Sequence, residues 1–237
     1  MTLRAVIFDL GGTLTGTQGV IDPVDPWFAY VMAVDPHRAD RWMSQLRAAE
    51  DAAWAACRDH SRSFTLSRML EYAEVPYSPY GMAAYRAACA PWMRAAPEAA
   101  GLLAAVRDRG LRVGVLSNTV WPASWHLEAL ERDGLLPFLD ASVFSSDLEY
   151  AKPHPDTFRT VLRALQVADP AAAVHVGDRL FEDVQGGTRA GLRTILVPGP
   201  PLPAAHRVIT HARATAKVSS LGAVLCTVEA WLGQSAP

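Results

Sequence analysis

The stretch Arg4-Ala-Val-Ile-Phe-Asp-Leu-Gly-Gly-Thr-Leu14 places a short apolar run directly before a carboxylate. An apolar run without polar alternation is typical of a strand that is buried on both faces. The run ends at Phe8 and Asp9 follows, with Gly11 two positions later. We therefore predict a buried strand that carries a carboxylate at its carboxyl end.

Further apolar runs of the same kind follow along the chain and alternate with segments of helical periodicity. The predicted strands are Arg4–Phe8, Leu111–Leu116, Ala141–Phe144, Ala173–Val176 and Arg193–Val197. The predicted helices between the later strands are 97–110, 122–133, 156–165 and 183–190. This alternation predicts an α/β fold with a Rossmann-like doubly wound parallel sheet, whose ligands bind at the carboxyl ends of the strands. Asp9, Ser117 and Asp178 all fall at that edge.

A long insert separates the first strand from the rest of the predicted sheet. It shows helical patterns only, at 37–60, 65–73 and 78–93. We predict two domains: a core of residues 1–15 and 97–237, and an all-helical cap of residues 16–96 at the edge where ligands bind.

The composition restricts the class of partner. Half of the 237 residues are hydrophobic, the formal net charge is −2, and we find no basic run. These features favour a globular protein that binds a small molecule, and argue against nucleic acid or a membrane as partner. The thiols Cys57, Cys89 and Cys226 have no C-x-x-C spacing and are expected to be reduced. No leader-like or membrane-spanning apolar segment stands out, so we expect a cytoplasmic protein. The oligomeric state is open.

Four short elements at the strand ends carry candidate chemistry, although each is weak alone. Asp9 could be a turn residue, and 116–119 (LSNT) an ordinary strand ending. Lys152 in AKPHP could be a solvated lysine, and 177–183 (GDRLFED) could open a capped helix. Lys152 and Lys217 are the only lysines, which makes Lys152 more informative than a lysine in an average chain.

In this order, each at the end of a strand, the four elements resemble the four motifs of the haloacid dehalogenase-like (HAD) hydrolase superfamily. FDLGGTL resembles motif I, Ser117 motif II, Lys152 motif III and GDRLFED motif IV. The helical insert lies where members with a C1 cap carry that cap, so the resemblance covers essentially the whole chain. It implies a Mg²⁺-dependent phosphohydrolase that acts on a small phosphorylated metabolite through an aspartyl-phosphate.

The resemblance also implies a role for each motif residue. Asp9 would be the nucleophile, and Ser117 and Lys152 would be the other catalytic residues. The implied metal ligands are Asp9, the Gly11 backbone carbonyl, Asp178 and, through water, Asp183. The implied phosphate-binding groups are Ser117, Lys152 and the backbone N–H groups of Gly12 and Asn118. Thr13 would brace the loop by a hydrogen bond or be a simple turn residue. The chemistry agrees, because clustered carboxylates repel one another unless a hard cation such as Mg²⁺ neutralises them.

Position 11 departs from the family pattern, in which this residue is usually an aspartate. Gly11 keeps the backbone carbonyl but lacks the side chain that protonates the leaving alcohol. General acid–base catalysis contributes about 10² to 10⁴ in rate, so we expect weak or substrate-restricted activity unless another group supplies the proton. Asp22, Asp25 and a metal-bound water are the candidates. The alternative is a catalytically impaired protein that binds metal and a phosphorylated ligand or partner.

Other residues give less specific expectations. The predicted cap is rich in tryptophan: Trp27, Trp42, Trp54 and Trp92. Most of these rings are expected in the cap core, with one facing the substrate. His126 is expected to be a surface or helix residue rather than an acid–base group. GDRLFED is the metal-binding form of motif IV, which argues against dehalogenation, and the absence of a G-x-x-x-x-G-K-[ST] motif excludes a P-loop kinase. The physiological substrate stays open.

Overall fold

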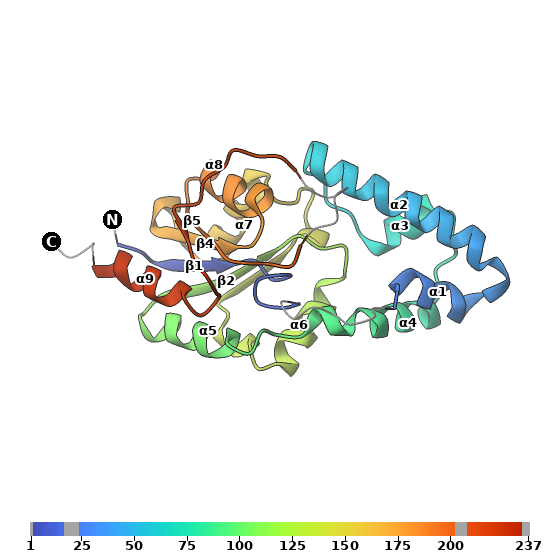
Figure 1. The fold of residues 1–237 in the computed structure, drawn as a ribbon, viewed down its shortest axis with the longest axis horizontal. Coiled ribbons are helices and arrows are strands. Elements are labelled where there is room, and N and C mark those ends of the chain that lie inside the picture. Colours follow the sequence, from blue (N-terminus) through green and yellow to red (C-terminus); the bar gives the residue numbers. More distant parts are fainter. Residues whose placement is uncertain (1, 17–23, 202–207, 234–237) are drawn as a thin grey trace.

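A six-stranded parallel sheet forms the centre of the fold (Figure 1). The computed structural model describes residues 2–16, 24–201 and 208–233. The strands are β1 (Ala5–Phe8), β2 (Arg112–Ser117), β3 (Ala141–Phe144), β4 (Ala173–Gly177), β5 (Arg193–Leu196) and β6 (Ala216–Lys217). Their order is β3-β2-β1-β4-β5-β6, and each neighbouring pair is parallel. The predicted α/β, Rossmann-like fold is confirmed.

Helices cover both faces of this sheet (Figure 1). One face packs against α5 (Ala99–Asp108), α6 (Ala123–Arg132) and α9 (Val224–Gly233), and the other against α7 (Pro155–Ala164) and α8 (Gly186–Arg189). In β1, Val6 and Phe8 join the first core and Ala5 and Ile7 the second, because successive side chains of a strand alternate. Shorter helical turns lie at Leu136–Phe138, Ser145–Asp147 and Pro170–Ala172, with a π-helical turn at Leu180–Gln185.

The structure departs from the sequence-based expectation at several elements. The first three residues of β3 are only partly buried, because β3 is an edge strand with one neighbour. The helix predicted over 183–190 is instead a π-helical turn followed by α8. The sequence pattern predicts neither β6, which is too short to show a period, nor α9.

Four helices between β1 and α5 lie beyond the carboxyl ends of the strands (Figure 1). They are α1 (Pro26–Val34), α2 (Ala39–His60), α3 (Leu66–Tyr72) and α4 (Pro79–Cys89), with short turns at Pro36–Arg38 and Ala90–Met93. We call them the helical insert. Its side chains form an apolar cluster of their own, separate from the two clusters that flank the sheet. Within the described ranges, no helix is long and apolar enough to cross a membrane.

Helix α1 is absent from the sequence-based prediction, although its start carries a recognisable signal. The Asp25 side chain accepts hydrogen bonds from the backbone N–H groups of Trp27 (2.9 Å) and Phe28 (3.3 Å), and Pro26 occupies the first helical position. Asp25, one of the predicted substitutes for the missing acid, is therefore a helix cap.

The contact between α1 and α4 depends on a glycine. The Tyr30 hydroxyl donates to the Pro76 carbonyl at 2.6 Å and accepts from the backbone N–H of Ser78 at 2.8 Å, just before α4 begins. A Cβ atom at Gly81 would lie 2.5 Å from Val34 Cγ2 and 2.7 Å from Tyr30 Cε2. Gly81 thus allows the two helices to approach closely.

We predict that Gly81→Ala lowers the free energy of unfolding by about 1 to 3 kcal/mol, because the added methyl group overpacks the α1–α4 contact. Gly101→Ala in α5 is the matched control, since nothing lies within 4 Å of a Cβ atom there. It should raise the free energy of unfolding by up to about 1 kcal/mol through helix propensity. Urea denaturation measures both values, and equal effects of the two substitutions would contradict the packing argument.

Candidate active site

The carboxyl edge of the sheet gathers the polar residues that the sequence motifs predict. Asp9 follows β1, Ser117 ends β2, and Asp178 follows β4. Lys152 comes from the loop before α7, and Asp183 from the π-helical turn after β4. Such turns are rare and are frequently found at functional sites. The strand order therefore brings together residues that are far apart in the sequence.

Lys152 is the buried centre of this group. Only 1% of its surface is exposed, and its ammonium donates to Asp9 Oδ1 and to Asp183 Oδ1, both at 2.6 Å. Burial acts to lower the pKa of Lys152, but the charges of Asp183 and Asp9 outweigh burial and hold that pKa above its usual range. Lys152 therefore stays charged despite being enclosed.

Asp183 is held ionised by several donors. Besides Lys152, His175 Nε2 lies 2.9 Å from its Oδ1, and the backbone N–H of Arg179 donates to its Oδ2 at 2.9 Å. Burial acts to raise the pKa of Asp183, but Lys152 and His175 outweigh burial and lower that pKa below its usual range. The sequence analysis missed His175, although a polar residue in the buried run Ala173–Gly177 is a detectable signal.

Asp178 is the least satisfied carboxylate of the group. Both of its oxygens are buried and have no hydrogen-bond partner among the described residues, although Arg179 Nε lies 3.0 Å from Oδ2 as an ion pair. Burial, then the charges of Asp9 and Asp183, raise the pKa of Asp178 to about 8. Two glycines pack against the Asp178 side chain. A Cβ atom added at Gly12 would lie 2.7 Å from Asp178 Oδ2, and one added at Gly199 would lie 2.0 Å from the same oxygen.

These carboxylates fit a divalent cation. Asp9, Asp178 and Asp183 each offer a ligand oxygen, and these atoms lie within 4.8 Å of one another. Hard cations such as Mg²⁺ prefer oxygen ligands of this kind, and a cation would satisfy the two unpartnered oxygens of Asp178. The predicted contribution of the Gly11 carbonyl stays a prediction.

Two predicted phosphate-binding groups lie at the end of β2. Ser117 is buried, and its hydroxyl makes only a long contact of 3.5 Å with the Asn118 carbonyl. The Asn118 backbone N–H donates to no other described residue.

The Asn118 side chain has a further role that the sequence analysis missed. Its Nδ2 donates to the Lys152 carbonyl at 2.8 Å, and its Oδ1 accepts from the Lys152 N–H at 2.7 Å.

The loop after Asp9 corrects the expectation for Gly12 and favours the turn-residue interpretation of Thr13. The Gly12 N–H, predicted to bind phosphate, donates to the Thr15 carbonyl at 2.7 Å, whereas the Gly11 N–H donates to no other described residue. The Thr13 hydroxyl is buried without a hydrogen-bond partner in the described part of the chain, and the Thr15 hydroxyl instead donates to the Leu10 carbonyl at 3.3 Å. The closed turn from Leu10 to Thr15 therefore uses the Gly12 N–H, whereas the Thr13 hydroxyl takes no part in it.

A cleft of about 610 Å³ opens from Asp9 and Lys152 towards the helical insert. Several aromatic side chains line it: Trp54, Tyr85 and Trp92 from the insert and Trp121 from the loop after β2. Two of the four predicted cap tryptophans, Trp27 and Trp42, are instead buried in the insert core.

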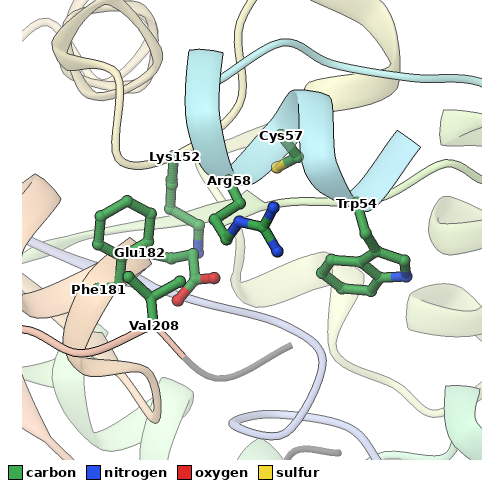
Figure 2. Close-up of a pocket in the computed structure, with 7 residues that line it drawn as sticks. All are labelled: Trp54, Cys57, Arg58, Lys152, Phe181, Glu182 and Val208. Carbon is green, nitrogen blue, oxygen red and sulfur yellow. The ribbon is translucent and has the colours of Figure 1, made fainter. Parts of the chain in front are cut away.

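A much smaller pocket, of about 10 Å³, lies where α2 meets the core (Figure 2). Trp54, Cys57 and Arg58 of α2 face Lys152 and Glu182 across it. Burial raises the pKa of Cys57 to about 11 and also raises the pKa of Glu182. Cys57 is therefore a thiol at neutral pH, and its position shows that α2 approaches Lys152 closely.

His126 lies on α6 but is buried rather than at the surface. Its ring stacks between Trp121 and Phe144, with centroid distances of 5.5 Å and 4.8 Å, and its Nε2 lies 2.8 Å from Thr119 Oγ1. Burial lowers the pKa of His126 to about 4, so the ring is neutral at physiological pH.

The remaining predicted acid, Asp22, lies outside the described residues.

The fold and site define a Rossmann-like α/β protein with a lysine-bridged carboxylate centre at the carboxyl edge of its sheet. Residues 3–191 match the family described as haloacid dehalogenase-like hydrolase, so the chain belongs to this family of hydrolases. The family resemblance noted from the motifs is thereby confirmed.

One sequence relative and two solved structures are similar to this chain. A glyceraldehyde 3-phosphate phosphatase from Pyrococcus abyssi (strain GE5 / Orsay) is 25% identical over 202 residues, which cover 81% of this chain and 80% of that protein. A HAD phosphatase structure from Thermococcus onnurineus has a TM-score of 0.64 at 19% identity, covering 95% of this chain and 98% of that chain. An L-2-haloacid dehalogenase structure from Xanthobacter autotrophicus has a TM-score of 0.66 at 21% identity, covering 96% and 99%. At these identities, the two structures show a shared fold alone.

We predict that Asp178→Asn stabilises the metal-free protein at pH 9 by on the order of 1 kcal/mol, because it removes a buried charge that lacks hydrogen-bond partners. The gain should shrink at pH 6, since a carboxyl with a pKa of about 8 is protonated there and the charge is already absent. Thermal unfolding in the presence of a chelator measures both values.

The same variant should lose the increase in melting temperature that millimolar Mg²⁺ gives the unmodified protein, because ligand binding stabilises only a competent site. A matched Na⁺ concentration controls for ionic strength. Equal stabilisation of both proteins by Mg²⁺ would argue against Asp178 as a ligand.

Proposed function

We propose that the protein is a Mg²⁺-dependent phosphatase that hydrolyses a small phosphorylated metabolite through an aspartyl-phosphate on Asp9. The observation that carries this proposal is the contact of Asp9 with a fully buried lysine at the floor of an open cleft. Phosphoryl transfer requires an aligned nucleophile and positive charge on the phosphoryl oxygens, and this pair offers both. The relative from Pyrococcus abyssi, which is named as a glyceraldehyde 3-phosphate phosphatase, adds support.

The carboxylate of Asp9 is oriented for attack. Lys152 holds Oδ1, while Oδ2 makes no hydrogen bond to a described residue and remains available to attack phosphorus. The bond from Asp9 to phosphorus forms as the bond to the leaving oxygen breaks, and water then hydrolyses the aspartyl-phosphate and restores Asp9. A bound Mg²⁺, held by Asp9, Asp178 and Asp183, would neutralise charge on the phosphoryl group.

The phosphoryl oxygens would meet donors from two loops. The Ser117 hydroxyl and the Asn118 N–H come from the end of β2, and the Gly11 N–H comes from the loop after β1. Asn118 also fixes the backbone of Lys152 through its side chain, so one residue would position both the phosphate and the lysine.

We further propose that residues 16–96 act as a cap on a core of residues 1–15 and 97–237. Trp54, Tyr85 and Trp92 of this segment line the cleft above Asp9, so they would contact the leaving group rather than the phosphate. The separate apolar cluster of the insert supports its treatment as a unit of its own.

The leaving group would depart without help from position 11. Asp25, the predicted substitute in the described part of the chain, is occupied as the cap of α1 and in an ion pair with Arg47 at 2.5 Å. A Cβ atom at Gly11 would meet nothing within 4 Å, and Gly11 lines the cleft. The site therefore has room for the carboxylate that it lacks, and substrates with good leaving groups should be favoured.

We predict that Asp9→Asn abolishes hydrolysis of p-nitrophenyl phosphate, because the amide is a poor nucleophile. It should also abolish the homoserine that borohydride reduction of an aspartyl-phosphate leaves at position 9, as detected by mass spectrometry. Circular dichroism should confirm that the variant stays folded. Turnover at the original rate would exclude Asp9 as the nucleophile.

Gly11→Asp should raise kcat on alkyl phosphates by about 10² or more, because it restores a general acid. It should change p-nitrophenyl phosphate turnover much less, since that leaving group needs no proton. Gly11→Asn is the matched control, with similar size but no acid. A rate gain shared by both variants, or seen equally on both esters, would rule out a missing proton donor.

A further inference from the structure

Glu50 lies on the face of α2 that borders the cleft. Glu50, Trp54 and Cys57 are spaced by four and three residues, so they share one side of the helix, and all three line the cleft. Figure 2 shows Trp54 and Cys57 projecting from α2 towards the catalytic region. Glu50 is one turn further from the C-terminal end of α2.

Glu50 has no salt bridge or hydrogen bond to another described residue, although it is partly buried. The cation nearest to it along α2, Arg47, is paired with Asp25 at 2.5 Å. Burial, followed by the charge of Asp25, raises the pKa of Glu50, although the charge of Arg47 acts to lower it. A carboxylate in such surroundings is costly unless a partner of opposite charge meets it.

Aromatic side chains line the same cleft as Glu50. Tyr85 packs against Trp27 with ring centroids 4.5 Å apart, and the Tyr85 hydroxyl accepts from Trp121 Nε1 at 3.4 Å. Trp54 and Trp92 line the same cleft. Aromatic faces attract cations as well as apolar groups, so ring walls with one carboxylate suit an organic ammonium.

The charged groups that line the cleft also favour a ligand with a cationic end. The lysine and arginines that line it are paired with acids: Lys152 with Asp9 and Asp183, Arg179 with Asp178, and Arg62 with Glu149. Of the charged residues that line the cleft in the described ranges, Glu50 on the insert side and Glu182 on the core side make no ion pair with another described residue. A substrate with a phosphate at one end and a cation at the other would match this polarity.

We propose that Glu50 and the surrounding rings form a subsite for a protonated amine on the leaving alcohol, so that the preferred substrates are phosphate esters of amino alcohols. This inference rests on the proposed phosphatase function, because it assumes that the phosphate group binds at Asp9 and Lys152. Glu50 acts here as a specificity-determining residue and takes no part in the bond-breaking step.

The test compares two series of compounds as competitive inhibitors of p-nitrophenyl phosphate hydrolysis. One series is ω-aminoalkyl phosphates with two to six carbons, and the other is ω-hydroxyalkyl phosphates of the same lengths. We expect the amine to bind about tenfold more tightly than the alcohol at one best length, a difference of about 1.4 kcal/mol. Inhibition constants avoid any need for the slow alkyl esters to turn over.

Glu50→Gln should reduce this preference, measured as the ratio of the two inhibition constants, to near unity. Asp51→Asn is the matched control, since it removes the same charge from the next position of α2, where the side chain is exposed; it should keep the preference. Equal inhibition by the two series in the unmodified protein, or an undiminished preference in Glu50→Gln, would overturn the inference.

A lack of p-nitrophenyl phosphate hydrolysis would contradict the proposed function without testing the subsite. In that case, calorimetric titration of the same two series into the unmodified protein and into Glu50→Gln, both with Mg²⁺, tests the subsite directly. Tighter binding of the amines that depends on Glu50 supports the subsite, and its absence refutes it.

Discussion

The ammonium of Lys152, enclosed between Asp9 and Asp183, is the interaction on which the site depends. A buried ammonium is tolerated only where opposite charges and hydrogen bonds surround it. Here the partners come from the end of β1 and from the π-helical turn after β4, while Asn118 at the end of β2 holds the lysine backbone. Lys152 thus connects three neighbouring strands, through its ammonium to the ends of β1 and β4 and through its backbone to the end of β2. Loss of Asp9 or Asp183 would leave the buried ammonium with a single carboxylate partner.

That arrangement still leaves an excess of negative charge. Asp183 receives donors from Lys152, His175 and the Arg179 backbone, whereas the oxygens of Asp178 receive no hydrogen bond from the described residues. The unequal treatment has a physical reason. Lys152, His175 and the Arg179 backbone already compensate the charge of Asp183, whereas the charge of Asp178 would be compensated by the proposed cation. On that proposal, the metal-free protein gives up some stability for affinity for a metal.

Much of this architecture can be predicted from sequence, because buried strands leave uninterrupted apolar runs. The end of such a run locates Asp9, Ser117 and Asp178 at one edge without further information. Features that depend on local hydrogen bonding, or on packing between distant elements, cannot be predicted in this way. The Gly12 N–H, for example, donates to the Thr15 carbonyl within a tight turn, and residue spacing does not reveal this bond. Glu50 gains its significance only from the face that α2 presents to the cleft.

The two unusual features of the cleft bear on the same step of the proposed reaction. Without a carboxylate at Gly11, the leaving oxygen must carry more of its negative charge as the bond to phosphorus breaks. An ammonium a few bonds away stabilises that charge electrostatically, more strongly in a partly dry cleft than in water. The ammonium also makes the alcohol more acidic and thus a better leaving group. A site that recognises a cationic alcohol through Glu50 would therefore depend less on the proton donor that Gly11 lacks.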